Sequence, residues 1–124
     1  MTAPNIVNVS TITAKTASAA LGTSAASIVS NAASSNKVFK VNTILVSNID
    51  GTNNADVSIF LNDGAAGAGS TNRAIVKTVV VPADASLVVI DANSKLYLEE
   101  NTSITALASA ASDLEIIISY EEIS

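Results

Sequence analysis

The chain has 124 residues, 6 Lys and Arg against 11 Asp and Glu, and a formal net charge of −5 with a pI near 4.3. It contains no His and no Cys, which excludes imidazole bases, thiol nucleophiles, Ser-His-Asp triads, disulfides and the usual nitrogen and sulfur zinc sites. We therefore predict a protein that is not an enzyme, with no catalytic, cofactor-binding or metal-binding residues and no cofactor. The acidic balance and the scattered basic residues argue against nucleic-acid binding.

The apolar residues are of an unusual kind. Val, Ile and Thr together make 37 of the 124 residues, and these β-branched side chains fit a pleated, half-buried surface better than a helix. Only 14% of residues are charged, against about 25% in an average globular protein. We predict a single all-β domain over residues 1–124, with a surface of small polar side chains that suits contact with other subunits.

The N-terminal part is the hardest to assign. Residues 6–13 are typical of a strand, whereas residues 14–34 are rich in Ala, Ser and Thr. Apolar residues at helical spacing in this region favour a helix: Ala17, Leu21, Ala25, Ile28 and Ala32. Gly22 and the many Ser and Thr residues disfavour one. We predict two short strands, at about residues 15–21 and 26–31, and leave open whether residues 1–35 are ordered alone.

Residues 38–49 form one long apolar run, which predicts a strand. The Asp-Gly turn at residues 50–54 predicts a tight reversal, with glycine supplying a positive φ. Oxygen-bearing side chains gather in residues 50–56, and oxygen is the ligand that Ca²⁺ prefers. The loop lacks the alternating acids and terminal Glu of a calcium loop, so we interpret it as a hairpin turn rather than a metal site. Residues 57–61 then alternate as a strand does.

Residues 64–70 consist of Gly, Ala and Ser, which are too small to pack well. No Lys-Ser/Thr pair follows these glycines, so they do not form a phosphate-binding loop. We predict a mobile surface loop between two strands.

The remaining apolar runs are separated by short breaks, one of them at Pro82. We predict strands at residues 73–81, 86–91, 96–99, 103–108 and 114–123. Their spacing of about 8–12 residues is typical of an antiparallel β-sandwich of jelly-roll or immunoglobulin-like type.

The last strand has a particular pattern. Leu114, Ile116, Ile118 and Tyr120 share one face, which predicts a core face, while Ile117 lies on the other. Apolar side chains on both faces are expected of a strand that is interior to its sheet or covered by a neighbouring subunit.

Two acidic pairs and two tyrosines are candidate functional residues. Neighbours on a strand point to opposite faces, so neither Glu99-Glu100 nor Glu121-Glu122 forms an acid/base dyad by itself. We interpret both pairs as solvated strand ends that protect sheet edges. We expect Tyr97 and Tyr120 to be half-buried anchors whose hydroxyls reach the surface.

Charge is unevenly distributed along the chain. Residues 96–124 carry six acids and no base, whereas residues 1–95 carry a net charge of +1. Opposite signs on the two parts can steer a second copy or a partner into register. The acids can equally serve only to solubilise the final strands.

The N-terminus has no basic region followed by an apolar stretch, so we expect no secretory signal. No apolar run approaches the roughly 18 residues of a membrane-spanning helix. We expect synthesis as a soluble product in a cytoplasm, without a membrane partner.

Three segments together, residues 81–90, 96–104 and 113–123, resemble small all-β virion structural proteins of tailed bacteriophages, particularly viruses of cyanobacteria. The resemblance covers about residues 37–124 and rests on pattern, without a catalytic motif. It implies a virion component made in the host cytoplasm, present in many copies and contacting the major capsid protein or neck or tail components. A homo-oligomer that acts as a capsid decoration or cement subunit is the role we favour. A neck or tail protein and a receptor- or glycan-binding tip module are the alternatives.

Overall fold

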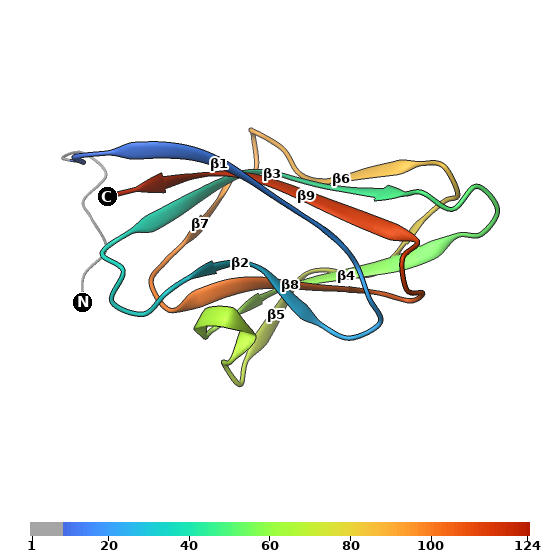
Figure 1. Cartoon of the computed structure of the whole chain (residues 1–124), viewed down its shortest axis with the longest axis horizontal. Helices are drawn as coiled ribbons and strands as arrows, with labels where there is room; N and C mark the ends of the chain where they lie inside the picture. Colours follow the sequence, from blue (N-terminus) through green and yellow to red (C-terminus); the bar gives the residue numbers. More distant parts are fainter. Residues whose placement is uncertain (1–8) are drawn as a thin grey trace.

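The computed structural model describes residues 9–124, which fold into two antiparallel sheets that face each other (Figure 1). Sheet A contains β1 (Ile12–Ala20), β3 (Val38–Asn48), β6 (Ser86–Ile90), β7 (Leu96–Leu98) and β9 (Leu114–Ile123). Sheet B contains β2 (Ala26–Asn31), β4 (Ala55–Asn62), β5 (Asn72–Val81) and β8 (Thr102–Ala108). A short 3-10 turn, η1 (Ala65–Gly67), lies on the side of sheet B that faces away from sheet A. The predicted all-β antiparallel sandwich is confirmed.

The strand order identifies the sandwich as a jelly roll. Sheet A has the order β1-β9-β3-β6, with β7 also paired to β3, and sheet B has the order β2-β8-β4-β5. The pairs are nested: β4 with β5, β3 with β6 and β7, β2 with β8, and β1 with β9. Successive pairs alternate between the sheets, as in a long hairpin rolled onto itself. This order selects the jelly roll from the two predicted alternatives.

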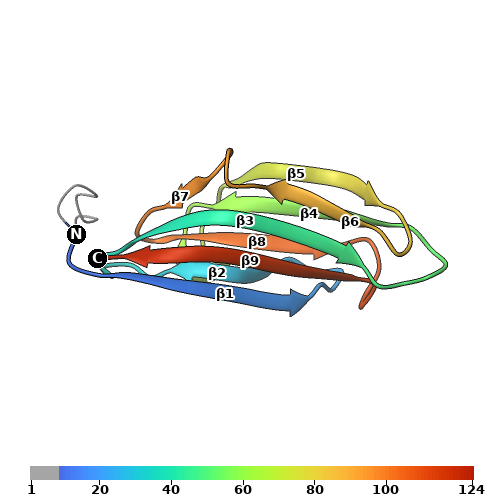
Figure 2. The same ribbon diagram turned by 90° about the horizontal axis from the view of Figure 1, so that it is seen from above.

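The last strand, β9, lies inside sheet A. It pairs with β1 on one side and with β3 on the other, as Figure 2 shows from above. Its side chains Leu114, Ile116 and Ile118 are fully buried, whereas Ile117 is 41% exposed. The predicted core face and interior position are therefore confirmed. Strand alternation also puts Ile123 on the same face as Ile117, yet Ile123 is only 5% exposed.

The core between the sheets is built mainly from β-branched side chains. Sheet A contributes Val41, Ile44 and Val46 from β3, and sheet B contributes Val57 and Ile59 from β4, all of them fully buried. Such side chains have few rotamers to lose and fit pleated surfaces closely. The packing of this core therefore explains why the sequence is rich in β-branched residues.

The N-terminal part is confirmed as strands rather than helix. The two predicted strands correspond to β1, which runs from Ile12 to Ala20, and to β2. The strand predicted at residues 6–13 is wrong at residues 9–11, which precede β1 without strand geometry; residues 1–8 lie outside the described part. Thr11 and Ser124 exchange backbone hydrogen bonds of 2.9 Å, which continue the ladder of β1 and β9.

The connection after β3 is not the predicted hairpin. β3 lies in sheet A and β4 lies in sheet B, so the chain crosses between the sheets here. Gly51 does not adopt a positive φ. Side chains make the turn instead: Asn48 Oδ1 accepts from the Asp50 N–H at 2.9 Å, and Asp50 Oδ1 accepts from the Thr52 N–H at 2.8 Å. The Asp-Gly pair signals a turn, and tertiary packing decides that the turn changes sheets.

The Gly/Ala-rich segment is not a free loop, contrary to prediction. It lies against the outer face of sheet B and is held by hydroxyls from strands distant in sequence. Ser103 Oγ donates to the Gly64 carbonyl at 2.7 Å and accepts from the Gly67 N–H at 2.9 Å. Ser30 Oγ accepts from the Ala66 N–H at 2.8 Å. Three backbone N–H or carbonyl groups are thus satisfied without water.

The two ends of this segment are joined through one amide. Asn62, which is 2% exposed, accepts from the N–H groups of Gly64 and Gly69 at 2.9 and 2.8 Å. Its Nδ2 donates to the Gly69 carbonyl at 3.1 Å and to Asn72 Oδ1 at 2.8 Å. A Cβ on Gly69 would overlap the backbone nitrogen of Gly64, so glycine is required for this close approach.

Candidate interaction surface

The outward side chains of sheet A form rows across its strands. One row, the apolar row, places Ser18, Ile117, Leu45 and Val88 side by side on β1, β9, β3 and β6. Ile117 is 41% exposed and Val88 is 59% exposed. Cross-strand neighbours on one face lie about 5 Å apart, so the three large side chains form a continuous apolar strip.

A second row, the charged row, places Ala14, Glu121, Lys40 and Tyr97 side by side on β1, β9, β3 and β7. Glu121 and Lys40 are half-buried, and no ion pair within 4.0 Å joins them; the ion pairs formed by the described residues both involve Glu122. Both charged groups are therefore available to a partner.

Exposed large apolar side chains are concentrated on this face. The described part of the chain has six of them, and four belong to sheet A: Ile12, Val88, Tyr97 and Ile117. The other two are Ile49, after β3, and Val80, on β5. Exposed apolar side chains gathered on one face mark an interaction site more often than scattered ones do.

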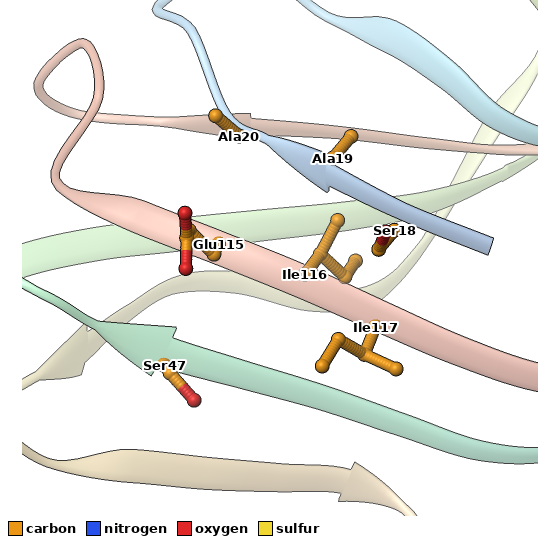
Figure 3. Close-up of a pocket in the computed structure, with 7 residues that line it drawn as sticks. All are labelled: Ser18, Ala19, Ala20, Ser47, Glu115, Ile116 and Ile117. Carbon is orange, nitrogen blue, oxygen red and sulfur yellow. The ribbon is translucent and has the colours of Figure 1, made fainter. Parts of the chain in front are cut away.

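The face also has a shallow hollow of about 310 Å³ next to the apolar row (Figure 3). It is lined by Ser18, Ala19, Ala20, Ser47, Glu115, Ile116 and Ile117. The hollow forms because β1 carries small side chains beside the longer ones of β9. Sheet A is therefore low along β1 and high along β6, where Val88 projects.

An ion-pair cluster closes one end of the sandwich. The Glu122 carboxylate lies 3.1 Å from the ammonium groups of both Lys15 and Lys37. Burial raises the pKa of Glu122, but the hydrogen bonds from Lys15 and Lys37 outweigh this effect and hold it below its ordinary value. The same hydrogen bond, together with the nearby negative charge, raises the pKa of Lys15. The cluster ties β1 and the start of β3 to β9.

The acidic pairs were only partly understood from the sequence. Glu121 and Glu122 do point to opposite faces, but β9 is no edge strand, so their interpretation as edge protection is wrong. Glu99 and Glu100 follow β7 in a turn. Both carboxylate oxygens of Glu100 are buried and accept no hydrogen bond from the described residues, so this group is not a solvated strand end.

The tyrosines occupy different environments. Tyr120 is half-buried, as predicted, with its ring 5.3 Å from that of Phe39 and tilted by 30°. Tyr97 is more open, with 41% of its surface exposed on the outer face of sheet A. Only Tyr120 therefore contributes to the packing of the sandwich.

The oxygen-rich segment 50–56 uses the carboxylate of Asp50 for its own turn. Asp50 accepts from the Thr52 N–H and from Asn53 Nδ2, and these bonds, the first above all, lower the pKa of Asp50. Among residues 9–124, no three His, Cys, Asp or Glu side chains come together in a way that could hold a metal ion.

The sequence did not reveal the two rows, because rows depend on which strands pair. The one signal was the Ile116-Ile117-Ile118 run, which placed an apolar side chain on the outer face. Within the described part, no helix has the length and apolar character needed to cross a lipid bilayer.

The comparison with solved structures agrees with the fold. No protein-family model matches the chain, and no curated protein matches it. The chain is similar to a solved structure from work on Bacillus endospore appendages, which are described as a novel family of disulfide-linked pili. The TM-score is 0.54 and the sequence identity is 18%. The match covers 92% of this chain and 87% of the other. At this identity the similarity concerns the fold alone.

Proposed function

We propose that the protein is a non-enzymatic structural subunit of a tailed-bacteriophage virion, where it acts as a capsid decoration protein. The observation that carries the proposal is the outer face of sheet A, with its exposed apolar row. A side chain such as Ile117 gains stability only when another surface removes it from water, by about 25 cal/mol per Å² of apolar area.

The mechanism of such a subunit is mechanical. A rigid sandwich covers the seam between shell proteins and contributes buried area on both sides of the seam. The low fraction of charged residues supports this role, because few charges must be desolvated when the surface is covered. The resemblance of residues 37–124 to small virion proteins supplies the setting, with the major capsid protein or neck or tail components as partners.

A fibre subunit is the second candidate, and the similarity to a protein of endospore pili favours it. A jelly roll can stack on its own copies into a filament when the contact between them does not close into a ring. This chain contains no Cys, so its filaments would be held without disulfide links.

The test is quantitative mass spectrometry and electron microscopy of purified particles from cells that make the protein. Decoration predicts on the order of hundreds of copies per particle, and a neck or tail role about a dozen. Filaments containing the protein would favour the fibre subunit. Absence from particles and filaments alike would contradict a structural role.

A further inference from the structure

We infer that the outer face of sheet A binds the same face of a second copy, related by a two-fold axis that runs parallel to the strands between β9 and β3. The inference deepens the proposed function by naming one partner of this surface and the geometry of the contact. It rests on the order of side chains along the two rows.

The charged row is complementary to itself under this axis. The rotation exchanges the positions of β9 and β3, so Glu121 of each copy faces Lys40 of the other. Each interface then contains two such ion pairs. The apolar row behaves in the same way, because Ile117 of one copy faces Leu45 of the other. Each charged group therefore faces a group of opposite charge, and each apolar group faces another apolar group.

The relief of the face fits the same axis. The rotation also exchanges β1 with β6 and β7, so it places small side chains opposite large ones. Ser18, in the hollow, faces the projecting Val88, and Ala14 faces Tyr97. The low side of one copy thus receives the high side of the other, as close packing requires.

The alternative in-plane axis, perpendicular to the strands, does not fit. Centred at the level of Ile118, it would place Glu115 of one copy against Glu121 of the other, so acid would face acid along β9. Like charges opposed across an interface cost affinity. The axis parallel to the strands avoids this, and it gives the aligned arrangement that twisted sheets adopt when they pack face to face.

Sheet A is large enough for a reversible contact. Four strands about 4.8 Å apart and the nine residues of β1 at about 3.3 Å each cover roughly 550 Å² of flat area. Two copies bury about 1,100 Å², just above the roughly 1,000 Å² that a specific interface needs. We therefore expect a dimer whose formation depends on concentration.

Cysteine cross-linking tests the geometry, because the natural chain has no Cys. We expect an equimolar mixture of Ser18→Cys and Val88→Cys chains to form a covalent heterodimer under mild oxidation, and Ser18→Cys alone to form little, because the axis keeps the two β1 strands apart. The matched control is Ala74→Cys, an exposed position on β5 of the other sheet, mixed with Val88→Cys. Equal cross-linking in both mixtures would contradict the inference.

Charge reversal provides a second test that does not depend on oxidation. Lys40→Glu alone and Glu121→Lys alone should each lower the association constant at least tenfold, since each opposes like charges twice. Mixing these two variants should restore association as a heterodimer. Thermal melting of each variant verifies that it is folded. Failure of the mixture to associate, with both variants folded, would overturn the pairing.

The outcomes separate this inference from the proposed function. A protein that is abundant on particles but gives no Ser18–Val88 cross-link would keep its structural role and lose the two-fold contact. A protein that forms the cross-linked dimer but is absent from particles and filaments would keep the contact and lose the role.

Discussion

On the outer face of sheet B, the segment 63–71 lies against β8 and is held by Ser30, Ser103 and Asn62, whereas the outer face of sheet A presents Ile117 and Val88 to solvent. The two faces belong to one sandwich and share one core. Their difference is that sheet B uses a part of its own chain to cover polar strand positions, while no described segment covers the apolar row of sheet A.

This difference teaches where the fold is complete and where it is not. Hydroxyl and amide side chains on sheet B form hydrogen bonds with the backbone N–H and carbonyl groups of a loop that could not pack by itself. This face therefore needs no second chain to cover it. The exposed apolar side chains on sheet A lower the free energy only when a second surface removes them from water, so this face needs a partner to cover it. Stability should therefore respond to changes on sheet B, and association to changes on sheet A.

The largest loss of stability is expected from Asn62→Ala. The change removes four hydrogen bonds and leaves the N–H groups of Gly64 and Gly69 without their acceptor. We expect a loss of about 3 kcal/mol and a fall in the thermal midpoint of roughly 10 °C. The control is Asn93→Ala, at an exposed turn, which should change stability by less than about 0.5 kcal/mol. Equal melting of both variants would mean that sheet B does not depend on its loop.

A smaller loss is expected from Ser103→Ala. Its fully buried hydroxyl bonds both Gly64 and Gly67, so its removal should cost about 1–2 kcal/mol. Hydrogen exchange of the Gly67 amide should accelerate more than that of amides in β9. Unchanged exchange at Gly67 would show that the hydroxyl does not hold the segment.

A still smaller effect, visible mainly through its pH dependence, is expected from Glu122→Gln. Because the folded-state pKa of Glu122 is lowered, its contribution to stability is present above the unfolded-state pKa and is lost as the pH falls through the folded-state value. The variant should melt below the parent at pH 7, and the gap should begin to narrow only as the pH falls below the ordinary Glu pKa of about 4.3. Melting curves at a series of pH values measure this, and a constant gap down to pH 2 would contradict it.

The stability contributed by Lys15, in the same ion-pair cluster, has the opposite dependence on pH. The pKa of Lys15 is raised, so its contribution is present below the unfolded-state pKa and is lost as the pH rises through the folded-state value, above about pH 10. The parent and a Lys15→Met variant should therefore converge only in strongly alkaline solution.

The sequence was sufficient where a pattern is local. The bounds of β2 and β9 were predicted to the residue, because alternation and run length are properties of consecutive residues. The start of β1 was missed by several residues, since its small side chains carry little alternation.

The sequence was insufficient where contacts between residues far apart in the chain determine the local structure. The Gly-rich segment looked unable to pack because Ser30 and Ser103, which hold it, are more than thirty residues away along the chain. The Asp50-Gly51 turn looked like a hairpin because only the sheet assignment of β3 and β4 shows a crossing. Ile117 was recognised as outward, but its neighbours Leu45 and Val88 follow only from the pairing.

The most direct test of the account compares association of the parent with that of two folded variants by sedimentation over a range of concentrations. Ile117→Lys changes the apolar row, and Val80→Lys changes a side chain of sheet B that is somewhat more exposed, 52% against 41%. The account predicts that Ile117→Lys lowers the association constant at least tenfold, while Val80→Lys leaves it within a factor of about two. Equal association of all three proteins, or a greater loss with Val80→Lys, would contradict the assignment of sheet A as the contact face.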